Sequence, residues 1–268
     1  MSFNVDGIIV DEILSVWAED FNGKPLYRIT QASEGTLDVT AETKEAKDKN
    51  GTLIKKSYTA KAASLSITNA MLDLNAYAHT TGSDKIVASE DNKIKVPKLL
   101  LVDSDDKSVV LPDEPIDGTI TVTAVKTNGS LGKTYDLSAA SEATATEYAY
   151  NKSTNSVTLP VDFDASEVSE FLIKYEYITG NAVMIEQKGD KFPDTVKLIV
   201  QVLYSDECNK GFSRLAYIII PSFQVSPETS MQMKTDSTFE FKGDAQMDYC
   251  SKNKRLYYIV FPDGDVKK

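Results

Sequence analysis

His79 is the only histidine among the 268 residues, and it limits the chemistry that the chain can perform. A Ser–His–Asp triad or a histidine-containing zinc site needs partners around the imidazole, and no motif in the sequence supplies them. The sequence also contains no Gly-x-Ser-x-Gly elbow, Walker A loop or dinucleotide-binding fingerprint. We therefore interpret His79 as a residue near the end of a helix, and we expect neither enzymatic activity nor a cofactor.

The acidic and thiol side chains give no stronger indication of a metal site or of a disulfide framework. Asp103, Asp105 and Asp106 have part of the spacing of a calcium-binding loop, but the glycine and distal glutamate that complete such a loop are missing. We predict a solvated linker there, and no metal site.

Cys208 and Cys250 are too few for a disulfide framework, and free thiols in a reducing compartment are the favoured interpretation. Whether the two cysteines pair stays open.

The segment 43–56 differs from the rest of the chain in its charge. It holds five lysines against Glu45 and Asp48, a net charge of +3 in a protein of net charge −11. Leu53 and Ile54 stand side by side within it, and burying both would contribute roughly 3–6 kcal/mol. Either these two residues begin a strand and tuck beneath their own sheet, or the segment docks into another copy of the protein. In the second interpretation the contact residues are Lys44, Lys47, Lys49, Leu53, Ile54, Lys55 and Lys56.

The flanking sequence predicts a long hairpin that positions this segment. Residues 35–43 alternate apolar and polar side chains, as expected for a strand with one dry and one wet face. Asn50-Gly51 is a strong turn signal, and residues 57–67 form a return strand. The apolar positions of the return strand change phase, which a bulge or strong twist near residues 62 and 63 would reconcile. The wet face of the first strand consists of Thr36, Asp38, Thr40 and Glu42.

One helix is predicted, over residues 69–80, with Thr68 or Asn69 as its N-cap and Gly82 just beyond its end. Its apolar positions share one face, so one side of the helix is expected to pack on a sheet.

The first strand is predicted at residues 8–20, with Trp17 in the core. Frequent Thr, Val, Ile, Tyr and Phe in short runs also favour a mainly β protein.

The residues from 103 to 180 differ from the rest of the chain in the spacing of their predicted strands and turns. Short predicted strands, at 119–125, 147–150, 156–161 and 171–177, are separated by turn signals, which is typical of a small β-sandwich. This segment carries 14 acidic and 5 basic residues, a net charge of −9. We therefore predict an inserted domain at 103–180 within a discontinuous domain formed by 1–102 and 181–268.

The overall charge bears on possible partners and on location. A net charge of −11 and a pI near 4.7 argue against binding nucleic acid through its phosphates. The first ten residues lack the pattern of a signal peptide, and no run approaches the length of a membrane span. Synthesis in the cytoplasm, without a membrane partner, is the expectation.

The chain resembles the tail tube (major tail) proteins of long-tailed bacteriophages. The resemblance is carried by residues 33–68 (SEGTLDVTAETKEAKDKNGTLIKKSYTAKAASLSIT) and by the helix NAMLDLNAYA that follows. It continues in residues 191–204 (KFPDTVKLIVQVLY) and in the C-terminal run 216–261. The segment 103–180 falls outside it and looks like the additional immunoglobulin-like or related β domain that some tube proteins carry.

The resemblance implies a fold of two packed β-sheets with a flanking helix, and self-association into hexameric rings that stack into a tube. It also implies that the long hairpin reaches the adjacent ring, that other tail proteins are partners, and that DNA passes through the lumen without specific binding. The location would be the virion tail, assembled in the host bacterial cytoplasm. The wet face of Thr36, Asp38, Thr40 and Glu42 is then the candidate lumen surface, because hydroxyls and carboxylates offer DNA no attractive charge.

Two other readings stay open at this stage. One is the inner tube of a contractile injection or secretion device, such as a type VI secretion tube. The other is a monomeric carbohydrate-binding tail or surface module, which would need exposed Trp and Tyr side chains for stacking on sugars. The single Trp, predicted to be buried at position 17, weakens that reading.

Overall fold

The computed structural model describes residues 7–140, 142–206, 213–230, 233–235, 237–249 and 253–262. Cys208 and Cys250 lie outside these residues. The protein is mainly β, as predicted from the sequence. Contacts between residues divide the chain into two units, Met1–Lys85 with Ile185–Lys268, and Ile86–Met184.

This division starts the second unit earlier than the boundary at 103 expected from the sequence. The difference comes from β6 (Ile94–Asp103), which pairs with β12 (Val168–Thr179) along its whole length, from Ile94↔Thr179 to Asp103↔Glu170. The segment 94–103 thus belongs to the sheet of the second unit. The connection between the units consists of β5 (Asp84–Val87) and β13 (Val183–Glu186), which form a two-stranded sheet.

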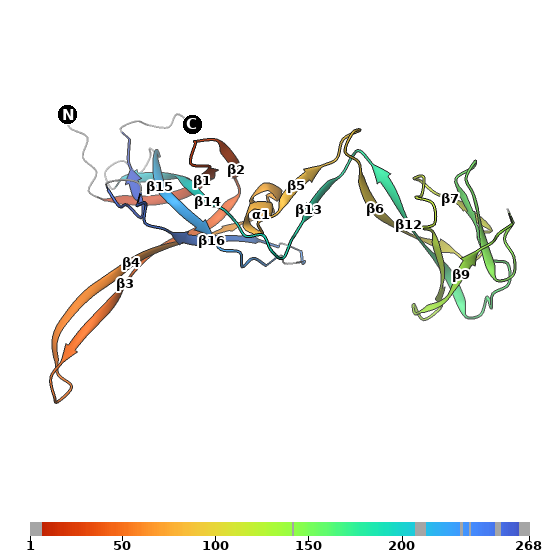
Figure 1. Ribbon diagram of the computed structural model, residues 1–268, viewed down its shortest axis with the longest axis horizontal. Helices are drawn as coiled ribbons and strands as arrows, with labels where there is room; N and C mark the ends of the chain where they lie inside the picture. Colours follow the sequence, from red (N-terminus) through yellow and green to blue (C-terminus); the bar gives the residue numbers. More distant parts are fainter. Residues whose placement is uncertain are drawn as a thin grey trace. The chain divides into compact units, whose positions relative to one another are not determined.

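The first unit contains one eight-stranded sheet (Figure 1). Its path runs β2-β1-β14-β15-β16-β4-β3, and the short β17 pairs with β15. The strands are β1 (Ile8–Glu19), β2 (Pro25–Ile29), β3 (Ala32–Lys47), β4 (Leu53–Asn69), β14 (Thr195–Asp206), β15 (Arg214–Val225), β16 (Phe239–Ala245) and β17 (Tyr258–Val260).

The two packed layers expected from the sequence are parts of this one continuous sheet. β15 pairs with β14 over nearly all its length but with β16 only at its last three residues. Gly243 of β16 allows the close approach, since a Cβ there would collide with the Gln224 carbonyl oxygen and the Phe223 ring. β3 folds back over β1, where a Cβ at Gly35 would lie 2.6 Å from Ile13 Cδ1. The largest fully buried side chains of this core are Tyr204, Phe223, Phe241, Ile29, Ile67, Leu198, Ile220 and Val16.

The helix of the first unit, α1 (Leu74–Thr80), begins later than the predicted residue 69. Asn69 stays in β4, where it pairs with Ala32 and Phe239, so the predicted N-cap was wrong. Asp73 is the N-cap instead, because its Oδ1 accepts hydrogen bonds from the backbone N–H groups of residues 75 and 76 at 2.9 and 2.8 Å. Gly82 follows the helix with φ 65°, as the sequence predicted.

Trp17 is half-buried, and its predicted place in the core was wrong. Val16 and Ala18 are fully buried, so the side chain between them points to the opposite face of β1. There the Trp17 indole N–H donates a hydrogen bond to Ser15 Oγ at 2.9 Å, and the Arg28 guanidinium lies 4.8 Å from the ring centroid.

The second unit is a small β-sandwich with its own core. One layer has the strand order β6-β12-β8-β9 and the other β10-β11-β7, joined by a short parallel contact of β9 with β10. The remaining strands are β7 (Ser108–Val110), β8 (Thr121–Lys126), β9 (Leu131–Leu137), β10 (Glu147–Asn151) and β11 (Ser156–Thr158). The four strands predicted from the sequence correspond to β8, β10, β11 and β12. Phe171, Ile173, Tyr175, Val122 and Val157 are fully buried between the layers.

Candidate assembly surfaces

β3 and β4 continue beyond the sheet as a two-stranded arm (residues 40–62). β16 pairs with β4 only from Ala63 to Asn69, so no third strand among the described residues accompanies the pairs from Thr40↔Ala62 to Lys47↔Leu53. Figure 1 shows this ribbon leaving the body of the sheet. Eight strand residues at about 3.4 Å each carry the tip roughly 27 Å beyond the sheet. The predicted projecting hairpin is confirmed.

Two bulges in β4 shape the arm. The first lies at Ala60, which has φ 50° and falls between the pairs Ala41↔Lys61 and Glu42↔Thr59. It is close to the position, 62 or 63, that the change of phase predicted. The second leaves Ile54 without a cross-strand partner between Ala46↔Lys55 and Lys47↔Leu53. Bulges of this kind increase the local twist and redirect side chains.

The turn at the tip of the arm is fixed by Asp48. Its Oδ1 accepts hydrogen bonds from the backbone N–H groups of Asn50 and Thr52, at 2.8 and 2.7 Å. Gly51 has φ 84° and donates its N–H to the Asp48 carbonyl oxygen at 3.0 Å. The turn is therefore well defined although it is exposed, which holds the neighbouring side chains in place.

The tip (residues 43–56) presents apolar side chains and lysines to solvent. Leu53 is 49% and Ile54 70% exposed, so the alternative in which they tuck beneath their own sheet is wrong. Lys47 and Lys56 both pair with Glu45, at 3.3 and 3.9 Å. In the described part of the chain, the other three lysines of the tip form no ion pair. All seven residues singled out in the sequence thus lie together on one exposed structure.

The wet face predicted on β3 is exposed along its whole length. Thr36 and Asp38 lie in the body of the sheet, where they pair with Ser66 and Ser64 of β4. Thr40 and Glu42 lie further along the same face of β3, in the arm. The four residues share one face, as predicted, but they divide between the sheet and the arm.

The polar face continues across β4 and β16, which was not predicted from the sequence. Ser64 and Ser66 pair with Asp244 and Lys242, and Thr68 pairs with Glu240. Ser66 Oγ donates a hydrogen bond to Glu240 Oε1 at 3.1 Å. The signal was present in the run FEFKGDA, where the buried Phe239 and Phe241 alternate with charged residues.

A comparison with protein-family models matches the chain over residues 8–260 to the YomU/Tube protein family. The chain belongs to the YomU/Tube protein family. The match includes the whole arm, the polar face and the second unit. No curated protein matches the chain.

The name of the YomU/Tube family indicates a structural role in a phage tail tube. Such a role entails self-assembly into a tube, contact with other tail proteins and a place in the virion tail. It agrees with the resemblance found in the sequence. In the described residues, no helix is both long and apolar enough to cross a membrane.

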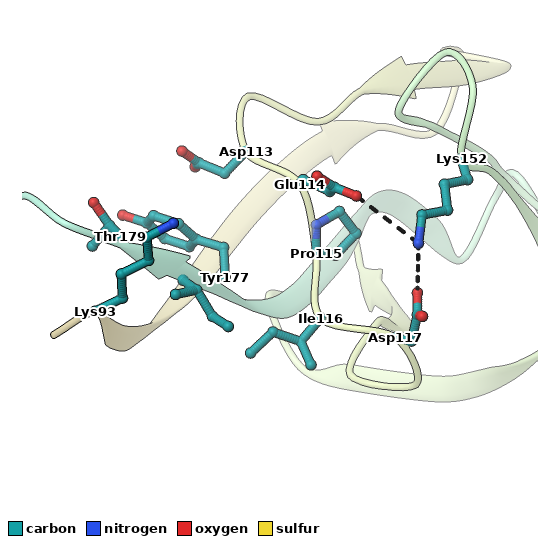
Figure 2. Close-up of a pocket in the computed structure, with 10 residues that line it drawn as sticks. Lys93, Asp113, Glu114, Pro115, Ile116, Asp117, Lys152, Tyr177 and Thr179 are labelled. Carbon is teal, nitrogen blue, oxygen red and sulfur yellow. Dashed lines mark ion pairs between the residues drawn. The ribbon is translucent and has the colours of Figure 1, made fainter. Parts of the chain in front are cut away.

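The second unit of this YomU/Tube protein contains an open cleft of about 520 Å³ beside β12. Figure 2 shows Lys152 between the carboxylates of Glu114 and Asp117, to which it pairs at 3.9 and 3.5 Å. These ion pairs are exposed, and each contributes only about 0–1 kcal/mol. The cleft is lined by Lys93, Asp113, Glu114, Pro115, Ile116, Asp117, Lys152, Tyr177, Ile178 and Thr179. None of them was singled out from the sequence, and no group of three or more His, Cys, Asp or Glu able to hold a metal ion occurs among the described residues.

His79 lies near the end of α1, as predicted, and contacts Tyr27 of β2. Their ring centroids are 5.3 Å apart, and Tyr27 Oη lies 3.3 Å from His79 Nδ1. Burial lowers the pKa of His79 below its ordinary value of 6.5, although the negative charge of Asp194 opposes this shift. Burial also raises the pKa of Tyr27, so its hydroxyl stays protonated, and the tautomer of the neutral His79 decides which of the two groups donates the hydrogen bond. The pair joins α1 to the sheet.

Proposed function

We propose that this protein assembles into hexameric rings that stack into a phage tail tube, through which DNA passes during ejection. The observation that carries the proposal is the arm, which projects well beyond its sheet and ends in two exposed aliphatic side chains among lysines. A two-stranded ribbon gains little stability on its own in water. Binding to a second copy of the protein would cover the apolar tip of the arm and would explain why the arm is so long.

The arm supplies the contact between rings in this proposal. Covering the exposed parts of Leu53 and Ile54 would contribute roughly 2–4 kcal/mol per arm, before the cost of ordering the contact. Six arms act together in each ring, so a modest energy per arm gives a stable stack. The lysines at positions 44, 47, 49, 55 and 56 would meet carboxylates of the next ring.

Ring closure would use the edges of the eight-stranded sheet. β2 and β3 end its path, and each has one side without a strand partner among the described residues. Exposed sheet edges are sites of association, and closing a sheet into a ring removes them. This supports β3 as part of an inner wall that continues from one subunit to the next.

The polar face of β3, β4 and β16 is the proposed lumen surface. Asp38, Asp244 and Glu240 put carboxylates on it, and Lys242 lies 3.9 Å from carboxylate oxygens of Glu228 and Glu240. Such a surface offers DNA little attraction, so DNA can slide past it. The low pI of the whole chain is weaker support for an acidic lumen. Residues 86–184 hold 16 acidic and 8 basic residues, so −8 of the net charge of −11 belongs to the second unit and not to the sheet that carries this polar face.

The proposed role is physical and needs neither catalysis nor a cofactor. Negative-stain electron microscopy of the purified protein, alone and with tail initiator proteins, tests it. Rings or tubes with sixfold symmetry are the expected result. A protein that stays monomeric under all these conditions would contradict the proposal.

A further inference from the structure

The tip of the arm has no partner surface within its own chain. Leu53 and Ile54 are exposed, and so is Tyr58 on the same strand. Glu45 is shared by two lysines, and Asp48 is engaged in the turn. A surface that receives the tip must therefore supply apolar side chains together with negative charge.

The first residues of β1 offer this combination. Ile8, Ile9 and Val10 are 38, 49 and 58% exposed. They are followed directly by Asp11 and Glu12, which are also exposed. This segment, residues 8–12, carries a net charge of −2, opposite in sign to the +3 of the tip. Three consecutive exposed aliphatic residues in a strand are costly unless a partner covers them.

The same segment is an open sheet edge. β1 pairs with β14 from Ile8 onward, but β2 joins its other side only from Val16 to Glu19. Among the described residues, the stretch 8–15 therefore has no strand on that side. In the arm, β4 also has one free side from Leu53 to Ala62. Two free edges can pair through their backbone groups, which adds to side-chain complementarity.

We propose that residues 8–12 of one copy receive the tip of the arm of a second copy. Ile8, Ile9 and Val10 cover Leu53 and Ile54, and the carboxylates of Asp11 and Glu12 face the lysines of the tip. Within a single chain both surfaces are exposed, so the contact forms between copies. This inference rests on the proposed stacking of rings, and it names the surface of the next ring that accepts the arm.

A competing receptor surface lies around α1. Met71 and Leu74 are exposed near the start of the helix, and Phe192 is exposed beside Gly82, just past its end. The charges near Phe192 are balanced, since two lysines and two aspartates alternate at positions 188, 190, 191 and 194. The Asp73 carboxylate accepts backbone hydrogen bonds as the helix cap. These hydrogen bonds leave the charge of Asp73 in place, so the surface carries a net charge of −1, against −2 for residues 8–12, and complements the tip less well.

Photo-crosslinking of the assembled protein distinguishes the two surfaces. With benzoylphenylalanine in place of Ile54, irradiation of assembled tubes followed by trypsin digestion should join the tip to peptide 1–28, which contains residues 8–12. Crosslinks to peptide 62–85 or 192–197 instead would overturn the proposal while leaving the stacking of rings intact. Absence of any assembly by the unmodified protein would count against the proposed function itself.

Charge reversal gives an independent readout. Glu12→Lys should raise the protein concentration needed for assembly at least tenfold, and adding Lys55→Glu in the same chain should recover most of that loss. Glu142→Lys, an exposed reversal in the second unit, is the matched control and should leave assembly unchanged. A Glu12→Lys protein that assembles like the control would overturn the proposal.

Discussion

Lys47 Nζ lies 3.3 Å from Glu45 Oε2 on the strand that leads to the tip of the arm. Lys56 approaches the other oxygen of the same carboxylate, at 3.9 Å. The second acid of the tip, Asp48, accepts backbone hydrogen bonds in the turn. The acids of the tip are thus occupied, and its surplus positive charge is available to a partner.

Reversing the unpaired charges of the tip should weaken assembly. We expect Lys44→Glu, Lys49→Glu and Lys55→Glu together to raise the concentration needed for assembly by about tenfold or more, because exposed ion pairs contribute about 0.2–1 kcal/mol each and reversal adds repulsion. Sedimentation velocity across a concentration series measures this. Raising the salt concentration should weaken wild-type assembly and affect the triple variant less. Equal salt dependence of the two proteins would show that these lysines do not meet carboxylates.

Gly243→Ala should destabilise the first unit strongly. The added Cβ collides with the Gln224 carbonyl oxygen and lies 2.7 Å from an atom of the Phe223 ring, at the place where β15 and β16 meet. Overpacking of this kind costs about 1–3 kcal/mol, and more where backbone must move. Urea unfolding measures the loss, with Gly189→Ala as the control because open space surrounds that position. Equal stability of the two variants would mean that the sheet does not depend on this close approach.

The stability of the first unit should decrease as the pH falls below about 6.5. The pKa of His79 is lowered in the folded protein, so between that lowered pKa and 6.5 the unfolded chain binds a proton that the folded chain does not. The stabilisation is fully present above pH 6.5 and is lost on acidification, at a slope of at most about 1.4 kcal/mol per pH unit for one group.

Urea midpoints between pH 5 and 7.5 test this expectation. In His79→Gln the slope should be reduced, because His79 is the only histidine. The comparison concerns slopes rather than absolute stabilities, since the substitution also removes the contact with Tyr27. The same slope in both proteins would assign the pH dependence to other groups.

Removing the second unit should leave the first unit folded and able to assemble. The second unit has its own core, and the two connecting segments lie side by side, with Ala88 N–H donating to the Ala182 carbonyl oxygen at 2.8 Å. A short glycine-rich turn can therefore replace residues 86–184. Circular dichroism and electron microscopy of the shortened protein check the result, and residues 86–184 expressed alone should unfold cooperatively. A shortened protein that fails to fold would show that the units depend on each other.

The alternation of side chains made the hairpin and the polar face of β3 predictable. Leu37 against Thr36 and Asp38 marks a strand with two different faces, and Asn50-Gly51 marks its turn. The same alternation in β16 marks Glu240, Lys242 and Asp244 as one face of a strand. Only the pairing of β16 with β4 joins that face to the polar face of β3, and this long-range contact is not revealed by the local pattern.

Other features depended on tertiary contacts. The helix start was misplaced because Asn69 and Asp73 are both good N-cap residues, and only pairing with Ala32 and Phe239 keeps Asn69 in a strand. Trp17 was misplaced because an aromatic residue in an apolar run suggests burial, whereas Val16 and Ala18 occupy the core face. The start of the second unit was displaced because β6 precedes the change of composition but pairs with β12.

The most direct test of the central claim is the assembly of Leu53→Ser/Ile54→Ser. Negative-stain microscopy and sedimentation should show wild-type tubes or stacked rings, and for the double variant only monomers or single rings with the wild-type melting temperature. Leu131→Ser/Leu137→Ser, which changes two exposed leucines of the second unit, should assemble like the wild type. Tubes of normal length formed by the Leu53→Ser/Ile54→Ser protein would contradict the claim that the arm joins one ring to the next.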